Sequence, residues 1–207
     1  MTRARKSDPT SWLPAPQANP WTRRERREIY RNPWLTLVED QVLTPAGTEG
    51  IYGVVAPRGL ALGVVPVDPD NFTWLVGQYR YPLDRYSWEI PEGGGAPELD
   101  PVAEAARELK EETGLTAATW THLMTLHTSN CFTSERAEIY LATDLKEGAP
   151  EPDETERLQL CRLPLTAACE LARTGVITDA MSVAALLRLD SIAGAGEALA
   201  LPGGLGK

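Results

Sequence analysis

Short apolar runs separated by turn-forming residues fill the middle of the chain. Each run has the length of a strand and is bounded by Gly, Pro, Asp or Asn, which are typical of turns. The pattern predicts strands, joined mostly as an antiparallel meander, at residues 34–43, 51–55, 60–67, 72–79 and 86–90. Further strands are predicted near residues 119–126, 138–143 and 158–164.

One helix is predicted between these strands. Asp100 followed by Pro101 is typical of an N-cap and the first helical position, and Gly114 is typical of the left-handed residue that ends a helix. Apolar residues recur between them at helical spacing and predict the buried face: Val102, Ala105, Ala106 and Leu109. Two later helices are predicted at 165–173 and 179–189. Strands around a central helix, followed by helices, predict an α+β fold or an α-β-α sandwich.

The two ends of the chain differ from its middle. Residues 1–20 are rich in Pro, Ser, Ala and Asn, and residues 192–207 are rich in Gly and Ala, so we expect a flexible arm and a flexible tail. Between them we expect N-terminal strands over residues 21–58 and a catalytic domain over residues 59–191.

The composition excludes several classes of protein. A chain of 207 residues, 43% hydrophobic and 24% charged, can bury the core of one globular domain, so whole-chain disorder is excluded. No apolar run approaches the roughly eighteen residues that cross a bilayer, and the N-terminal region holds no apolar signal segment. We therefore expect no membrane partner and a cytoplasmic location. Cys131, Cys161 and Cys169 are widely spaced, which indicates packing residues rather than disulfides or a zinc site.

The net charge of -9 is unevenly distributed. Residues 1–31 hold eight Lys or Arg against three Asp or Glu, about +5, and the remainder holds twelve against twenty-six, about -14. So acidic a domain repels nucleic-acid phosphates, and we expect no nucleic-acid partner. An anionic substrate would need a bound cation and a few placed arginines.

Four glutamates line one face of the predicted helix. Glu104, Glu108, Glu111 and Glu112 lie at i, i+4, i+7 and i+8. Like charges at i,i+4 cost about 0.2–0.5 kcal/mol per pair, so something should offset their repulsion. A hard divalent cation such as magnesium would do so, because it binds carboxylate oxygens. The charge spacing alone also allows a solvated acidic face.

The residues from Arg107 to Leu115 read Arg-Glu-Leu-Lys-Glu-Glu-Thr-Gly-Leu. This string resembles the second half of the Nudix box, R-E-U-x-E-E-x-G-U, in which U is a bulky aliphatic residue. The first half of the box matches at Gly93, but Leu99 stands where the box has Glu, and Glu98 is adjacent. The departure concerns the loop before the helix and leaves the glutamates of the helix in register.

The resemblance covers about residues 30–190 and extends to the ADP-ribose and nucleotide-sugar pyrophosphatase branch of the family. The segments that are similar in order and spacing are Asn32–Leu35, Ile51–Val55, Gln78–Pro82, Trp88–Pro91 and Pro152–Glu156. The resemblance implies a Nudix-type α-β-α sandwich with a mixed sheet, preceded by a small antiparallel N-terminal sheet. It also implies an enzyme that hydrolyses the pyrophosphate bond of a nucleoside diphosphate sugar, with ADP-ribose as first choice, to a nucleoside monophosphate and a sugar phosphate.

Roles for the glutamates follow from the same resemblance. It implies Mg²⁺, with Mn²⁺ possible, bound by Glu108, Glu112, Glu111 and the backbone carbonyl of Glu92. Arg107 would orient the glutamates through salt bridges. The general base would come from the acidic loop formed by Glu151, Asp153, Glu154 and Glu156, with Glu156 favoured over Glu154. Glu111 is a further candidate for a catalytic role.

Substrate contacts are also implied. Arg80 would bind phosphate through its planar guanidinium, and Arg58 is a weaker candidate for the same contact. Glu89 would accept a hydrogen bond from a sugar hydroxyl, and Trp34 would stack on the base in a site completed across a homodimer. Gly93, Gly94 and Gly95 would form a tight turn into the helix and let the backbone approach the diphosphate.

Two alternatives stay open. A Nudix domain can bind a nucleotide sugar as a sensor without hydrolysing it, although all three glutamates of the R-E-x-x-x-E-E half are present here. The chain can also be a Nudix hydrolase of nucleoside triphosphates or dinucleoside polyphosphates. Dimerisation is inferred from the resemblance and from the apolar N-terminal strands.

Overall fold

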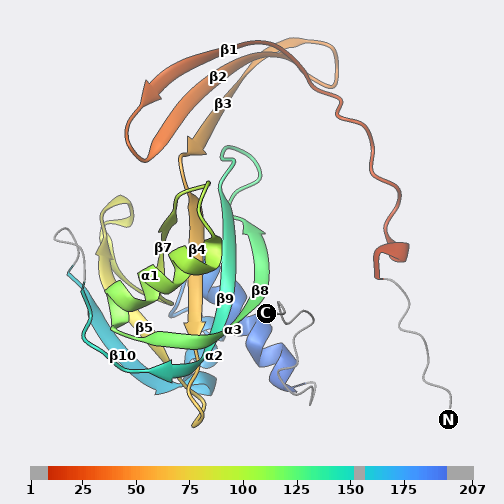
Figure 1. The fold of residues 1–207 in the computed structure, drawn as a ribbon. Coiled ribbons are helices and arrows are strands. Elements are labelled where there is room, and N and C mark those ends of the chain that lie inside the picture. The colour runs from red at the N-terminus through yellow and green to blue at the C-terminus, as the bar shows by residue number, and fades with distance from the viewer. Residues whose placement is uncertain (1–8, 152–156, 195–207) are drawn as a thin grey trace, which may run out of the picture.

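The computed structural model describes residues 9–151 and 157–194 (Figure 1). The helices are the short 3-10 helices η1 (Pro9–Trp12) and η2 (Tyr81–Leu83) and the α-helices α1 (Pro101–Thr113), α2 (Leu165–Arg173) and α3 (Ala180–Gly194). The strands are β1 (Thr22–Arg31), β2 (Leu35–Leu43), β3 (Glu49–Pro57), β4 (Leu60–Pro66), β5 (Phe72–Arg80), β6 (Arg85–Glu89), β7 (Glu92–Gly95), β8 (Thr116–His127), β9 (Arg136–Lys146) and β10 (Gln159–Pro164).

Across the described residues the strands form three sheets, ordered β1-β2-β3, β10-β5-β6 and β7-β4-β9-β8. In the last of these, β4 pairs antiparallel with β7 and parallel with β9. The four-stranded sheet is therefore mixed. The chain passes from the second sheet to the third between β6 and β7, within residues 90–92.

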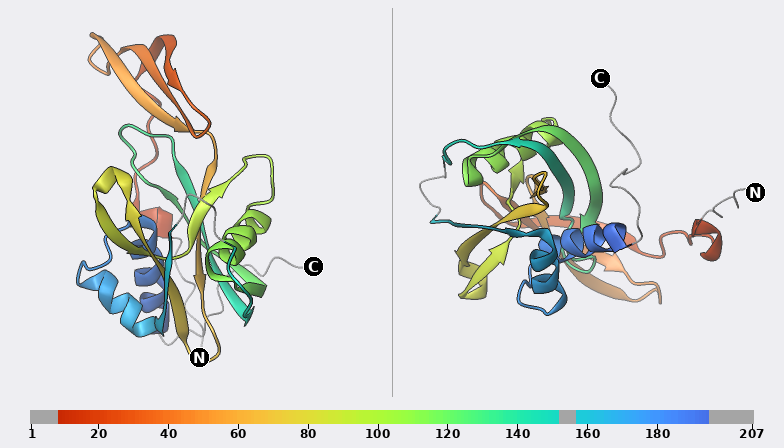
Figure 2. Two further views of the ribbon diagram at one scale, coloured as in Figure 1. Left: turned by 90° about the vertical axis from the view of Figure 1, so that its left-hand side faces the viewer. Right: turned by 90° about the horizontal axis from the view of Figure 1, so that it is seen from below.

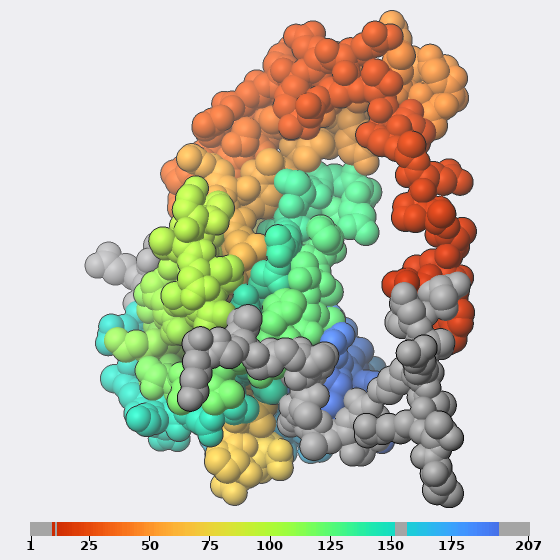
Figure 3. All heavy atoms as spheres, turned by 45° about the vertical axis from the view of Figure 1, so that its right-hand side comes forward, coloured from red at the N-terminus to blue at the C-terminus, as the bar shows by residue number. Residues whose placement is uncertain are grey.

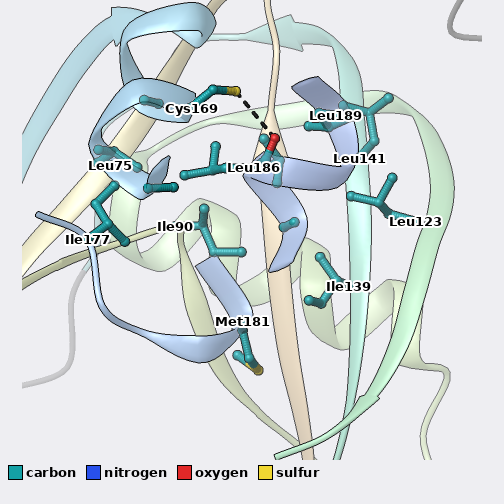
Figure 4. Packing of buried hydrophobic residues seen from close by; sticks show 14 of the residues in the cluster. Leu75, Ile90, Leu123, Ile139, Leu141, Cys169, Ile177, Met181, Leu186 and Leu189 are labelled. Atoms are coloured by element: carbon teal, nitrogen blue, oxygen red, sulfur yellow. Dashed lines mark hydrogen bonds between the residues drawn. The ribbon is translucent and has the colours of Figure 1, made fainter. Parts of the chain in front are cut away.

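Successive residues of β9 point to opposite faces of the mixed sheet and divide the core into two clusters. Tyr140 and Ala142 pack with Leu109 and other residues of α1 on one face. Ile139 and Leu141 pack with residues of α2 and α3 on the other face, as Figure 4 shows. Helices thus cover both faces, which confirms the predicted α-β-α sandwich.

The sheet of β1, β2 and β3 projects from the rest of the molecule (Figures 2 and 3). It is antiparallel throughout, as predicted. Its strand β3 also contacts the loop between β8 and β9, because Val55 N donates to Phe132 O at 2.8 Å and Ser134 N donates to Val55 O at 3.1 Å. The small N-terminal sheet is therefore tied to the main domain at the end of β3.

The local signals for the helices hold in the structure. Asp100 Oδ1 accepts a hydrogen bond from Val102 N at 3.3 Å, and Gly114 has φ 74°. Helix α2 has the predicted bounds, whereas α3 continues to Gly194. Residues 192–194, which we expected in the flexible tail, are thus helical, and residues 195–207 and 1–8 lie outside the described part of the chain.

Two expectations about the strands are wrong. The first strands do not form one meander, because β4 pairs with β7 and β9 rather than joining β3 and β5 through a ladder. Strands β1 and β7 were also missed. Every residue of β1 is exposed, and β7 reads Glu-Gly-Gly-Gly, so neither has the apolar alternation that predicts a strand. Among the described residues, no helix is long and apolar enough to cross a membrane.

Candidate active site

The glutamate face of α1 lies against β7, and the peptide N–H groups of this strand hold two of the glutamates. Glu108 Oε1 accepts from Gly94 N at 3.1 Å, and Glu112 Oε2 accepts from Glu92 N at 3.0 Å. Glu108 and Glu112 are one helical turn apart, so the spacing along α1 matches two alternate peptides of the extended strand. These contacts fix the positions of both carboxylates along the strand.

Gly93 makes room for this arrangement. A Cβ atom built on Gly93 would lie 2.0 Å from Cδ of Glu108 and 2.3 and 2.4 Å from its two oxygens. A side chain at this position would therefore displace the Glu108 carboxylate. Our expectation of a tight glycine turn into the helix is wrong, because Glu92–Gly95 form a strand, and the missing Cβ serves the carboxylate instead.

Burial and the neighbouring Arg107 act in opposite directions on the pKa of Glu108. Burial raises the pKa of Glu108, while the charge and hydrogen bond of Arg107 lower it and the charge of Glu111 raises it. Glu112 is only 3% exposed. Both are thus removed from bulk water, which strengthens any cation contact that they make.

Arg107 gathers three carboxylates and one carbonyl around its guanidinium. It donates to Glu108 Oε1 at 2.7 Å, to Glu111 Oε2 at 2.6 Å and to Glu104 Oε2 at 3.3 Å. It also donates to the carbonyl oxygen of Gly94 at 3.1 Å. The predicted salt bridges of Arg107 are therefore present, and its guanidinium compensates the charges of Glu104, Glu108 and Glu111.

The chemistry of these residues fits a divalent metal. The atoms that could bind a metal here are all oxygens, which suits a hard cation such as Mg²⁺ or Mn²⁺. The absence of a side chain at Gly93 leaves space for the Glu108 carboxylate. Within the described ranges, no three His, Cys, Asp or Glu side chains gather as a ready-made metal group. Glu108, Glu111 and Glu112 would therefore regroup around an ion, with Arg107 releasing part of its contacts.

The Glu92 side chain is buried and contacts Arg80 and Ser182. It is 9% exposed and lies 4.0 Å from Arg80 Nη2. Burial raises the pKa of Glu92 well above its ordinary value, the charge and hydrogen bond of Asp179 raise it further, and Arg80 opposes the shift. Ser182 Oγ donates to Glu92 Oε1 at 3.1 Å. The sequence pointed only to the backbone carbonyl of Glu92, and the contacts of its side chain were missed.

Arg80 and Glu89 bind each other on the β5–β6 hairpin. Arg80 Nε lies 3.1 and 3.0 Å from the two Glu89 carboxylate oxygens, and the Glu89 side chain is almost fully buried. This two-point contact compensates the buried charge of Glu89. The structure brings the pair next to Glu92 rather than to the cleft described next. Their predicted contacts with phosphate and sugar stay predictions.

Trp34 and Arg58 lie in a cleft of about 380 Å³ beside β7. The cleft also contains Gly93, Gly94 and Glu135. The Trp34 side chain is 75% exposed, and Trp34 O accepts from Arg58 N at 2.8 Å, which keeps the two residues together. The sequence thus pointed to four residues that the fold collects in one place, and the structure adds Glu135.

The acidic loop begins next to the end of α1. Glu151 N donates to the carbonyl oxygen of Glu111 at 2.8 Å, and Lys110 Nζ lies 3.2 Å from Glu151 Oε1. The two candidate bases, Glu154 and Glu156, lie outside the described residues. The loop that carries them therefore leaves the described part of the chain beside the glutamate helix.

The comparisons with known proteins agree with this geometry. Residues 21–55 match the model of the nucleoside diphosphate sugar hydrolase N-terminal domain, and residues 57–185 match the model of the NUDIX domain. The chain is 35% identical to an ADP-ribose pyrophosphatase of Mycobacterium tuberculosis, over 75% of this chain and 76% of that protein. It is 31% identical to an ADP-ribose pyrophosphatase of Bacillus subtilis, over 78% of this chain and 88% of that protein.

A solved structure, described as an ADP compounds hydrolase, has the same fold. It superposes with a TM-score of 0.77 at 25% identity and covers 89% of this chain and 100% of its own.

Proposed function

Because this chain belongs to the NUDIX family and is a hydrolase similar to ADP-ribose pyrophosphatases, we propose that its substrate is a nucleoside diphosphate sugar, with ADP-ribose as first choice. The reaction is the Mg²⁺-dependent cleavage of the pyrophosphate bond. One water molecule is consumed, one P–O bond of the anhydride breaks, and a nucleoside monophosphate and a sugar phosphate are released. Mn²⁺ should also support the reaction in place of Mg²⁺.

The observation that carries the proposal is the anchoring of two glutamates beside the cleft. The amides of Gly94 and Glu92 hold Glu108 and Glu112 at 3.1 and 3.0 Å. Glu108, Glu112, Glu111 and the Glu92 carbonyl would hold the metal. A divalent metal, which Nudix hydrolases generally use, lowers the charge of the diphosphate and makes a bound water more acidic.

The chain's own residues would bind the substrate and move the proton. Trp34 would stack on the base, and Arg58 would bind the diphosphate next to the glycines of β7. These roles are supported by the cleft that the residues share. Arg80 and Glu89 are proposed as further substrate contacts. Glu156, or else Glu154, would take the proton from the water as its oxygen attacks phosphorus in line.

We also propose that the protein is a homodimer whose subunits join through the N-terminal sheet. This proposal is supported by the exposed apolar side chains that this region carries, Trp21, Ile29, Tyr30 and Ile51. Light scattering after gel filtration tests it, and a monomer mass would contradict it. A cytoplasmic location stays a prediction.

The test of the function measures phosphate release after coupling to a phosphatase. The coupled substrates are ADP-ribose, GDP-mannose and UDP-glucose, and one nucleoside triphosphate is tested by its release of nucleoside monophosphate without the phosphatase, each with Mg²⁺ or with EDTA. We expect Mg²⁺-dependent turnover of ADP-ribose, its loss in Glu112→Gln, and no loss in Glu170→Gln, which alters an exposed glutamate on α2. Turnover of the triphosphate alone would make the protein a nucleoside triphosphate hydrolase. Binding without turnover would contradict the proposed reaction.

A further inference from the structure

Residues 90–92, here called the crossing segment, carry the chain from one sheet to the other. Glu89 still pairs with Val76 of β5, whereas Glu92 already pairs with Gly63 of β4. Two residues are thus left to make the change of sheet. Because Glu92 N is the donor that holds Glu112, the position of this segment sets the position of a proposed metal ligand.

One side chain from a distant helix binds both ends of the crossing segment. Ser182 Oγ accepts a hydrogen bond from Ile90 N at 2.9 Å and donates one to Glu92 Oε1 at 3.1 Å. Ser182 lies on α3, about ninety residues further along the chain, and is fully buried at 0% exposure. A hydroxyl suits this position because it can accept and donate at once.

Ser182 is itself held in place. Its backbone N donates to Asp179 Oδ2 at 2.7 Å, in the manner of a helix N-cap, and Asp179 also meets the Glu92 carboxyl group. On the other side of the segment, Val64 N donates to the carbonyl oxygen of Pro91 at 2.9 Å. The crossing segment is therefore fixed from β4 and from the first turn of α3.

We propose that Ser182 is a positioning residue for the metal site, which acts through the crossing segment on Glu112. The chain of contacts runs from Asp179 to Ser182, from Ser182 to Ile90 and Glu92, and from Glu92 N to Glu112. Substitution of a residue that orients a metal ligand typically costs about 10–100-fold in metal affinity or activity, because a misdirected carboxylate no longer meets the ion. The inference rests on the proposed function, since it assumes that Glu112 binds the metal.

The experiment compares Ser182→Ala with Ser182→Thr, which keeps the hydroxyl group. Mn²⁺ binding without substrate is measured by water-proton relaxation, and kcat and KM are measured with ADP-ribose and Mg²⁺. For Ser182→Ala we expect the Mn²⁺ Kd to rise and kcat to fall, each by about 10–100-fold. KM should change by less than about threefold, since the cleft residues keep their places. Ser182→Thr should restore most of both values.

A matched control separates positioning from stability. Leu189→Val removes volume from the same helix at a buried residue about 10 Å along α3 from Ser182. Its Kd and kcat should stay close to those of the wild type. If Ser182→Ala unfolds, Asp179→Ala removes the cap of Ser182 and should shift both values in the same direction.

Three results with the variants would overturn the proposal. They are a folded Ser182→Ala protein with Kd and kcat within about twofold of the wild type, the same shift in Leu189→Val, and a Thr variant as impaired as the Ala variant. If the wild type hydrolyses no nucleotide sugar, the proposed function fails, and the Mn²⁺ Kd still tests the role of Ser182. A wild type that binds no Mn²⁺ would overturn both.

Discussion

The need for glycine at position 93 can be tested by adding one methyl group. In Gly93→Ala the new Cβ would lie 2.0 Å from Cδ of Glu108, and ordinary contact begins at 3.4 Å. The Glu108 carboxyl group must therefore move by at least about 1.4 Å. Since this group is the end of a flexible side chain, it can move without a shift of the backbone.

The loss of activity follows from this displacement. A metal–oxygen bond to Mg²⁺ is about 2.0–2.1 Å long and tolerates only about 0.2 Å, so a carboxylate moved by more than 1 Å is lost as a ligand. A misplacement of about 1 Å costs on the order of 100-fold in rate. We expect kcat of Gly93→Ala to fall about 100-fold, which is roughly 2.7 kcal/mol in the activation free energy.

Stability should change far less than activity. The variant loses the hydrogen bond between Gly94 N and Glu108, worth about 1 kcal/mol, and gains about 0.5–1 kcal/mol because alanine is favoured over glycine in a strand. The free energy of unfolding should therefore stay within about 1 kcal/mol of the wild type.

The assay is steady-state hydrolysis of ADP-ribose over a range of Mg²⁺ concentrations, beside thermal unfolding of each protein. The matched comparison is Gly94→Ala, whose Cβ would meet no atom within 4 Å. Because Gly94 lines the cleft, we expect Gly94→Ala to lower kcat by at most about threefold. Equal activity of the two variants would refute the reasoning, and so would a Gly93→Ala protein that loses its fold rather than its rate.

Three further predictions concern other parts of the molecule. Glu112→Gln should lower kcat about 1000-fold with little change in the far-UV spectrum, since the amide keeps the shape but binds a hard cation poorly. A hydrogen bond from Arg26 lowers the pKa of Asp40 below its ordinary 3.8, so this pair stabilises the fold at neutral pH and ceases to do so as the pH falls below that value. The unfolding free energies of wild type and Asp40→Asn should thus converge as the pH falls below 3.8, and curves that stay parallel there would contradict the linkage. Burial raises the pKa of the Cys169 thiol to about 11, whereas Cys131 is exposed, so a disulfide reagent at pH 8 should label Cys131 quickly and Cys169 only after denaturation.

The helix that carries the glutamates could be predicted residue by residue, because its signals are local. Asp100 caps the first turn through its own side chain, and Gly114 takes up a positive φ of 74° that favours glycine. Both effects act within a few residues of the chain. The spacing of Glu108 and Glu112 on one face follows from helical geometry alone.

Strand β1 shows where local patterns fail. It is exposed along its whole length and rich in arginine and glutamate, so no apolar period marks it. It forms because its peptide groups pair with β2 and because Arg26 binds Asp40 at 2.7 Å across the pair. These contacts depend on a partner strand, and the pattern within β1 says nothing about its partner.

In the candidate site, too, the features set by local sequence could be predicted, and those set by distant contacts could not. Three of the proposed metal ligands, Glu108, Glu111 and Glu112, lie within one short motif and were predicted from it. The contact between Ser182 and Glu92 joins α3 to the crossing segment and exists only once the sheets have formed. An aspartate three residues before Ser182 marks a helix start, but nothing near it in the sequence names Ile90 as the partner.

Leu99 is the residue at which the sequence departs from the Nudix box, and the structure explains why the departure leaves the glutamates in place. Its side chain is 54% exposed on the loop before α1, and its backbone N donates to Ala96 O at 3.1 Å. The helix then starts at the Asp100 cap, which needs no side chain from position 99. Glu108 is held by Gly94 N and Arg107, both outside this loop. A substitution at Leu99 therefore alters an exposed loop, while the anchored carboxylates depend on β7 and on α1 itself.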